Sequence, residues 1–275
     1  MDGKVVVTGA SSGIGEATAH HLKQLGFDVL AGVRKGEDAD RLREGGVAPL
    51  MLDVTDAQSI AAARAEVGDG PLAGLVNNAG VAVSGPVEFV PIDELRRQLE
   101  VNLIGQVAVT QAFLPQLRRA RGRIVNVSSI GGRVALPLMS PYNASKFALE
   151  AVSDSLRREL RHLGVTVCVV EPGGVKTPIW RKGNRAADEL VASAPPEAAD
   201  LYGGMVASLR AEAEKIDRER GLPPTAVAEV IGEALTARRP RTRYLVGRDA
   251  KLRAWAAAVL PDRAMDALIG RALSG

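Results

Sequence analysis

Short apolar runs rich in valine and leucine alternate along the chain with longer stretches in which apolar positions recur at helical spacing. The short runs predict strands at Lys4–Thr8, Asp28–Gly32, Ala48–Leu52, Leu72–Val76, Arg123–Val127, Val165–Val170 and Arg243–Val246. Strands that are apolar on both faces are typical of a parallel sheet buried under helices. The alternation therefore predicts an α/β fold in which a mostly parallel sheet carries helices on both faces.

The stretches between the strands carry the helical pattern. The clearest predicted helices are Ile92–Arg119, Pro141–Leu163, Ala57–Val67 and Ala226–Ala237. Gly122 and Gly164 each lie between a helix and the next strand, where a left-handed C-cap is expected. No internal repeat, low-complexity tract or Gly/Ser linker interrupts the alternation, so residues 1–275 are predicted to form one domain.

Two segments depart from the alternation. Thr177–Pro224 has no strand pattern, contains two Pro-Pro pairs and mixes apolar with charged residues. A long excursion of this kind is often a lid, and we expect it to cover a substrate. Ala250–Gly275 predicts one or two amphipathic helices whose arginines flank apolar positions. Packing on the domain itself or on a neighbouring subunit is the favoured explanation, and an anionic membrane surface is the alternative.

The composition narrows the class of protein. The chain has 275 residues, of which 46% are hydrophobic and 24% charged, as in a soluble globular protein. The single cysteine, Cys168, cannot form an internal disulfide, and neither a signal-peptide pattern nor an apolar run of about eighteen residues occurs, which favours a cytoplasmic protein. The net charge of +3 is dispersed and aromatic residues are few, so no nucleic-acid partner is expected. No Cys/His/Asp spacing indicates a metal, so no metal site is predicted.

A glycine-rich turn follows the first predicted strand and leads into a helix. It reads Thr8-Gly9-Ala10-Ser11-Ser12-Gly13-Ile14-Gly15, and the three glycines stand where the backbone must turn tightly, approach a pyrophosphate and pack against the helix. The helix N-terminus then offers amide donors to phosphate groups. A second polar turn, Asn77-Asn78-Ala79-Gly80, ends the fourth strand at the same edge, where it serves a ligand or the turn itself.

The end of the second strand indicates which dinucleotide is preferred. Proteins that favour the unphosphorylated ribose usually carry an acid there for the 2′-hydroxyl, whereas this chain has Val33 followed by Arg34 and Lys35. A cation suits a 2′-phosphate, although Arg34 has the alternative of being a solvated loop residue. Asp53 and Val54 end the third strand and either flank the adenine ring or, for Asp53, cap the following helix.

Proton-transfer chemistry is indicated by Tyr142, with Lys146 four residues later and Ser129 thirteen residues before it. A phenol with an ordinary pKa of about 10 is a poor acid or base at neutral pH unless a nearby positive charge stabilises its anion. Lys146 lies one helical turn further along the same face and supplies that charge. Ser129 can hydrogen-bond a carbonyl oxygen, and Ser128 is its rival for this part.

These motifs in this order resemble the short-chain dehydrogenase/reductase family, in its Tyr-x-x-x-Lys branch, and the resemblance covers nearly the whole chain. It implies a single doubly wound Rossmann domain with a seven-stranded sheet. By the resemblance, Tyr142 is the catalytic acid/base, Lys146 also binds the nicotinamide ribose, Ser129 orients the substrate and Asn102 anchors a water in a proton relay. It further implies that the segment Pro172-Gly173-Gly174-Val175-Lys176-Thr177 holds the nicotinamide carboxamide through Pro172, Gly173, Val175 and Thr177. Members of the family are commonly homotetramers or homodimers.

The residues and the resemblance together predict an oxidoreductase that transfers hydride between NADP(H) and a secondary alcohol or ketone. Within the family, the stretches Gly26–Gly32, Tyr142–Leu149 and Ala237–Tyr244 look closest to hydroxysteroid and retinol dehydrogenases, which implies a bulky apolar substrate. Two alternatives are a redox-sensing regulator that binds the nucleotide without chemistry, and a reductase of the same fold that acts on another carbonyl class, such as small sugars or acyl-carrier thioesters.

Overall fold

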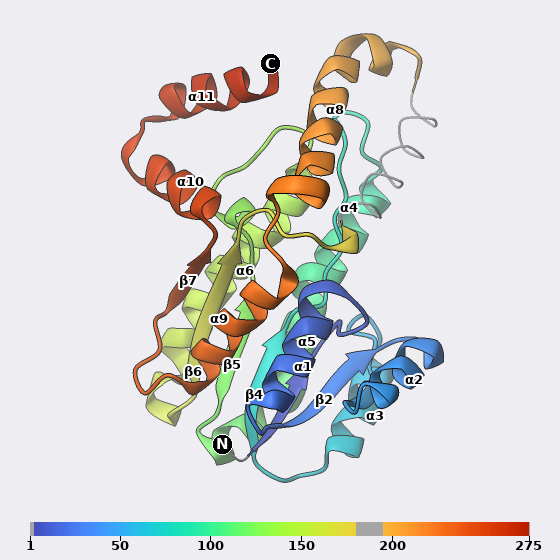
Figure 1. The fold of residues 1–275 in the computed structure, drawn as a ribbon, viewed down its shortest axis with the longest axis vertical. Coiled ribbons are helices and arrows are strands. Elements are labelled where there is room, and N and C mark those ends of the chain that lie inside the picture. The colour runs from blue at the N-terminus through green and yellow to red at the C-terminus, as the bar shows by residue number, and fades with distance from the viewer. Residues whose placement is uncertain (1–2, 180–194, 275) are drawn as a thin grey trace.

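The computed structural model describes residues 3–179 and 195–274 and forms a single α/β domain around one parallel sheet (Figure 1). Seven strands lie in the order β3-β2-β1-β4-β5-β6-β7, and every neighbouring pair is parallel. Their bounds are β1 Lys4–Val7, β2 Asp28–Val33, β3 Ala48–Met51, β4 Leu72–Asn77, β5 Arg123–Val127, β6 Thr166–Pro172 and β7 Arg243–Val246. The predicted strands and the doubly wound sheet are thus confirmed.

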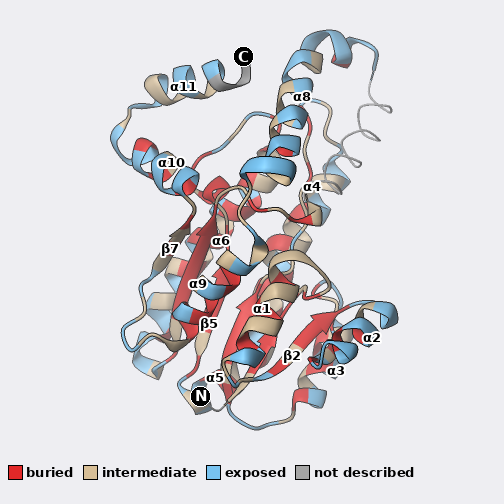
Figure 2. Ribbon diagram, viewed as in Figure 1, coloured by how far each residue is buried: buried red, intermediate tan, exposed pale blue. Residues whose placement is uncertain are grey.

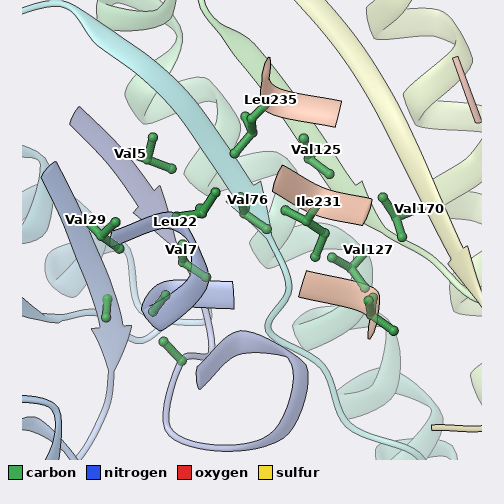
Figure 3. Packing of buried hydrophobic residues seen from close by; sticks show 14 of the residues in the cluster. Val5, Val7, Leu22, Val29, Val76, Val125, Val127, Val170, Ile231 and Leu235 are labelled. Atoms are coloured by element: carbon green, nitrogen blue, oxygen red, sulfur yellow. The ribbon is translucent and has the colours of Figure 1, made fainter. Parts of the chain in front are cut away.

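Helices cover both faces of the sheet because successive strand side chains point to opposite faces. Val5 and Val7 pack with α1 (Gly13–Gln24), α2 (Gly36–Glu44) and α9 (Pro224–Thr236), whereas Val6 packs on the other face with α3 (Ala57–Val67) and α5 (Gly105–Ala120). Figure 3 shows Leu22 and Ile231 among the sheet valines of the first cluster. Figure 2 shows that burial is concentrated in the sheet and in the helix surfaces turned toward it.

The long helix predicted at Ile92–Arg119 contains one irregular turn. Helix α4 spans Ile92–Leu99, a π-helical turn, η1, spans Glu100–Ile104, and α5 continues to Ala120. Asn102 lies in the middle of the π turn and is completely buried. The second long helix, α6, spans Ser140–Leu160 and carries Tyr142 and Lys146 in its first two turns.

One predicted helix end is wrong in its detail. Gly164 has the expected left-handed conformation, with φ at 76°, but at the end of α5 it is Arg121, with φ at 48°, that takes this conformation in place of Gly122. A Cβ at Gly122 would collide with the backbone carbonyl of Leu72. Gly122 is therefore required for the close approach of two chain segments, and the positive φ falls on its neighbour.

The segments that depart from the sequence alternation lie beyond the carboxyl edge of the sheet (Figure 1). Of the predicted lid Thr177–Pro224, residues 180–194 lie outside the described residues, and the rest contains α8 (Glu197–Lys215) and a π turn, η4 (Ile216–Arg220). The C-terminal region forms two helices, α10 (Arg248–Val259) and α11 (Asp262–Ser274), as expected. Within the described residues, no helix is both long enough and apolar enough to cross a bilayer.

Cys168 lies in the middle of β6, and its side chain is completely buried in the core beside the α9 face of the sheet. Burial raises the pKa of the thiol to about 11, while the charge of Arg123 opposes that rise. Because the thiolate is the reactive form, this cysteine is inert in the folded protein.

Candidate active site

A cavity of about 430 Å³ opens at the carboxyl edge of the sheet, where the strand order reverses between β1 and β4. Its walls come from the loops that follow six of the strands. The structure brings into this one cavity every residue predicted for the site except Gly15: Gly9, Ser11, Ser12, Gly13, Ile14, Arg34, Asp53, Val54, Asn78, Ala79, Gly80, Asn102, Ser129, Tyr142, Lys146, Pro172, Gly173, Val175 and Thr177.

The glycine turn after β1 has the geometry that a pyrophosphate requires. Gly9 and Gly13 have φ of 64° and 61°, a region that side chains rarely tolerate. A Cβ at Gly15 would collide with the carbonyl of Gly9, so Gly15 serves close packing behind the cavity wall. Ser12 is the N-cap of α1, yet its side chain makes no capping hydrogen bond. The Ser12 side chain therefore leaves the first amides of α1 uncapped, and together with the helix dipole these amides fit an anion.

Asn78 holds the glycine turn to the loop after β4. Its side-chain Nδ2 donates to the carbonyls of Thr8 and Gly9, at 3.0 and 3.1 Å. In return, the backbone amides of Asn78 and Ala79 both donate to the Thr8 hydroxyl at 2.9 Å. These four hydrogen bonds tie the two loops together and fix two walls of the cavity relative to each other.

Arg34 is well exposed at the rim, and its Nη1 lies 3.8 Å from Oδ2 of Asp53. Asp53 does not cap the next helix, because the N-cap of α3 is Asp56, whose side chain accepts from the Gln58 amide. Asp53 instead accepts from the Thr55 amide and hydroxyl, at 2.9 and 2.8 Å. Burial raises its pKa, but these hydrogen bonds and the Arg34 charge prevail and lower it overall. An anionic group at this rim therefore meets the exposed Arg34 guanidinium beside the hydrogen-bonded Asp53 carboxylate.

The reacting end joins α6 to the loop after β5. Ser129 hydrogen-bonds the Tyr142 hydroxyl, and the Lys146 ammonium lies 5.8 Å from the centre of the Tyr142 ring. Lys146 Nζ donates to the carbonyl of Val127 at 2.8 Å. Ser128 also lines the cavity, but its buried hydroxyl faces Gly132 and finds no hydrogen-bond partner among the described residues. The contact with Tyr142 thus favours Ser129 over Ser128 for the substrate oxygen.

The protonation states at the reacting end differ from the sequence expectation in one respect. Burial raises the pKa of Tyr142 in the protein alone, and the Ser129 hydrogen bond opposes but does not cancel this effect. Burial also lowers the pKa of Lys146 to about 8, against the Glu150 charge, which raises it. A stabilised phenolate was expected, whereas desolvation favours the neutral phenol. At neutral pH, Tyr142 is therefore protonated while Lys146 remains mostly charged.

Asn102 connects the loop after β4 to the start of α6. Its Oδ1 accepts from the Val81 amide at 2.9 Å, and its Nδ2 donates to the Val81 carbonyl at 3.0 Å and to the Ser145 hydroxyl at 3.2 Å. The Ser145 hydroxyl in turn donates to the Tyr142 carbonyl at 2.7 Å. The side-chain amide of Asn102 is thus engaged in positioning Tyr142. The expected water relay stays a prediction.

Sequence reasoning missed several apolar residues of the wall, among them Val81, Ala82, Val101 and Ile179, and the cationic Arg97. Arg97 contacts Glu94 through its Nη2 at 2.6 Å. No local signal marks these positions, because a valine in a loop or an arginine on a helix is ordinary. Val101 lies in the π turn, which the periodicity does not reveal, and Arg97 lies at the end of α4 just before it.

A doubly wound sheet whose glycine turn, cationic rim and Ser/Tyr/Lys cluster share one cavity defines a nucleotide-dependent oxidoreductase. A profile of the family described as short chain dehydrogenase matches residues 3–188. The chain therefore belongs to the short-chain dehydrogenase/reductase family, as the motifs implied, and it is an NAD(P)-dependent enzyme that acts on alcohol or carbonyl groups.

Both characterised relatives and solved structures are similar to this chain. An NADPH-dependent 3-dehydrocapnine reductase of Ornithobacterium rhinotracheale is 39% identical over 95% of this chain and 94% of its own, and human retinol dehydrogenase 5 is 39% identical over 96% and 87%. Among solved structures, a short-chain dehydrogenase of Burkholderia cenocepacia in complex with NADP matches with a TM-score of 0.76 and 28% identity, over 100% of this chain and 98% of the other.

Proposed function

We propose that the protein transfers hydride between NADP(H) and a bulky, apolar secondary alcohol or ketone. The observation that carries the proposal is the cluster of Ser129, Tyr142 and Lys146 in the same cavity as the glycine turn. The hydrogen bond between Ser129 and Tyr142 marks one place where a substrate oxygen can meet both hydroxyl groups. The roles assigned to these residues rest on that geometry.

The cavity fits a dinucleotide along its whole length. The uncapped amides of α1 suit the pyrophosphate, and Asp53 with Val54 suits the adenosine end. Arg34 offers the cation that a 2′-phosphate needs, which favours NADP(H) over NAD(H). At the nicotinamide end, Thr177 and Pro172 belong to the loop after β6 that reaches the same cavity. The NADPH-dependent relative and the NADP complex of a structural relative support this preference.

The bound cofactor supplies or accepts the hydride, and the residues of the chain handle the proton. In reduction, the Tyr142 hydroxyl gives its proton to the carbonyl oxygen, and the raised pKa of this tyrosine keeps that proton available at neutral pH. Ser129 donates a hydrogen bond to the same oxygen as negative charge develops on it. Lys146, still charged near neutral pH, stabilises the phenolate that remains. Oxidation of an alcohol follows the same path in reverse.

Several observations favour an apolar substrate. The wall beside the reacting end includes Val81, Ala82 and Ile179. Outside the cavity lining, the ring of Tyr202 on α8 meets Phe89 edge-on at 6.0 Å, and the Tyr202 hydroxyl donates to Glu88 at 2.8 Å. These contacts join the proposed lid to the loop before α4. The similarity to a retinol dehydrogenase adds support of a different kind.

The test is the initial rate of nicotinamide absorbance change with NADPH and with NADH, against a panel of steroid, retinoid, aliphatic and sugar carbonyls and the corresponding alcohols. Tyr142→Phe should bind cofactor normally and lose turnover by about 10²-fold or more. Tyr244→Phe is the matched control, because its hydroxyl lies on β7 and contacts the Arg241 amide. Near-normal turnover by Tyr142→Phe would overturn the assignment, and tight cofactor binding without turnover across the panel would favour a regulator.

We further propose that the enzyme assembles as a homodimer or homotetramer through its long helices. Ile104 at the α4–α5 junction and Phe147 on α6 are 50% and 43% exposed, which is unusual for large apolar side chains on such helices. Light scattering coupled to gel filtration measures the assembly directly. A monomeric mass at micromolar concentration would refute the proposal.

A further inference from the structure

A partly buried cluster of charges lies one helical turn from the catalytic lysine. It consists of Glu150 and Asp154 on α6, Glu171 on β6, Arg243 on β7 and Arg133 in the loop after β5. Glu171 is completely buried and Glu150 nearly so. Glu150 follows Lys146 by one helical turn, Glu171 directly precedes Pro172, and Arg133 lies four residues after Ser129. The cluster therefore joins three of the segments that form the reacting end.

The ion pairs are shared between the two glutamates. Arg133 Nε contacts Oε1 of Glu171 at 2.9 Å. Arg243 Nε contacts Oε2 of Glu150 at 3.1 Å and Oε1 of Glu171 at 3.3 Å, while its Nη2 contacts Asp154 at 3.0 Å. Because one nitrogen serves both glutamates, their carboxyl groups lie close together, and Glu171 is within hydrogen-bonding reach of Glu150.

Two carboxyl oxygens of the cluster have no donor. Asp154 also pairs with Arg157 at 3.0 Å and with Arg158 at 3.9 Å, so its charge is well compensated. Oε1 of Glu150 and Oε2 of Glu171, by contrast, are buried with no hydrogen-bond partner among the described residues. Two carboxylates whose free oxygens are both acceptors repel each other and cannot bond. One added proton turns that contact into a donor–acceptor pair.

We propose that Glu150 and Glu171 share one proton. Through the negative charge that it places one helical turn from Lys146, this pair controls the protonation of the lysine. Other charged groups border the pair. Arg133 and Arg243 face it directly, and Asp249 of α10 binds the Gly174 amide just beyond Pro172. Asp154 lies one turn further along α6 and pairs with Arg243, Arg157 and Arg158. Lys146 itself points away from the pair, to the Val127 carbonyl.

The titration of the pair supports this assignment. Burial and the Glu150 carboxylate together raise the pKa of Glu171 to about 7, against the opposing effect of Arg133. As pH rises through this value, the pair loses its proton and gains one negative charge. The Glu150 charge raises the pKa of Lys146, so the added charge keeps the lysine protonated to higher pH. The pH range in which Lys146 carries its positive charge is thereby extended upward.

The first experiment needs no turnover, so its result stands apart from the proposed function. The carboxyl carbons of ¹³C-labelled glutamate are followed by NMR from pH 4 to pH 9 in the wild type, Glu171→Gln, Glu150→Gln and Glu159→Gln. Glu159 lies on the same helix, exposed and in no ion pair with a described residue, and serves as the matched control. A resonance that titrates near neutral pH should be present in the wild type and Glu159→Gln and absent from Glu171→Gln. If every glutamate in the wild type titrates below about pH 5.5, the shared proton does not exist.

The second experiment tests the effect on Lys146 and rests on the proposed function. In Glu171→Gln the side chain at position 171 stays neutral at every pH. Lys146 should therefore lose its proton at a lower pH in this variant than in the wild type. A pKa lower by about half a unit reduces the ratio of kcat/KM at pH 9 to that at pH 7 by about three-fold. Glu159→Gln should match the wild type. An unchanged pH profile in Glu171→Gln, with the neutral titration lost, would refute the control of Lys146 by this pair.

Discussion

The buried amide chain between β4 and α6 gives a sharp prediction about stability. Asn77 Nδ2 donates to Oδ1 of Asn126 at 2.8 Å, and Asn126 Nδ2 donates to the Ser153 hydroxyl at 2.8 Å. All three residues are almost completely buried. The chain links the ends of β4 and β5 to the helix that carries Tyr142, so we choose Asn126→Ala as the perturbation.

The expected cost follows from the partners that lose a bond. Asn126→Ala removes two hydrogen bonds, each worth about 1 kcal/mol net. Asn77 Nδ2 keeps its bond to Thr110 at 2.9 Å but has one hydrogen left without a partner, whereas Ser153 still donates to the Leu149 carbonyl at 2.6 Å. One unsatisfied buried donor adds about 1–3 kcal/mol. The free energy of unfolding should therefore fall by about 3–5 kcal/mol.

Equilibrium urea denaturation measures this loss, with Gln111→Ala, an exposed amide on α5, as the control. A double-mutant cycle with Ser153→Ala isolates the hydrogen bond itself and should give a coupling of about 0.5–1.5 kcal/mol. A loss below about 1 kcal/mol, or strictly additive effects in the cycle, would refute the view that this amide chain holds the two strands to α6.

Two further predictions concern charge. Arg34→Glu should lower kcat/KM for NADPH by more than about ten-fold, while kcat/KM for NADH changes little. Lys35→Glu is the control, because Lys35 pairs with Glu37, and it should leave the ratio of the two kcat/KM values near that of the wild type. Equal losses with both cofactors would count against a role of Arg34 in binding the 2′-phosphate. For Lys146, whose folded pKa of about 8 lies below its ordinary 10.5, the unfolded chain binds the proton more tightly, so stability rises between these values as pH rises. Chemical denaturation should therefore show that the free energy of unfolding of the wild type, minus that of Lys146→Met, increases by at most about 3 kcal/mol from pH 7.5 to pH 10.5. A difference that stays constant with pH would show that Lys146 titrates normally.

The strands and the glycine turn could be predicted because their signals are local. Valine runs mark β1 and β5, and glycines with positive φ must stand where Gly9 and Gly13 stand. The order of the sheet, by contrast, came from a family resemblance and not from periodicity. Helical spacing alone cannot place the π turn around Asn102, since a turn of five residues, Glu100–Ile104, is too short to establish a period of its own.

The charge cluster behind Lys146 was beyond sequence reasoning for a different reason. Glu171 and Arg133 lie 38 residues apart, and Arg243 meets Glu150 across a separation of 93 residues. Only the pairing of β6 with β7, in which Val169 lies beside Arg243, brings these groups together. Likewise, the sequence contains the spacing of Tyr142 and Lys146 but not the desolvation that governs their pKa values.

The thiol buried in β6 makes the protein its own conformational reporter. Cys168 is the single cysteine of the chain and lies in a central strand with β5 on one side and β7 on the other. A thiol reagent can reach it only when that part of the sheet opens, so the rate of labelling measures opening of the sheet without an engineered probe. Under native conditions, a ligand that binds across the carboxyl edge of the sheet would slow the labelling in proportion to its affinity for the closed form.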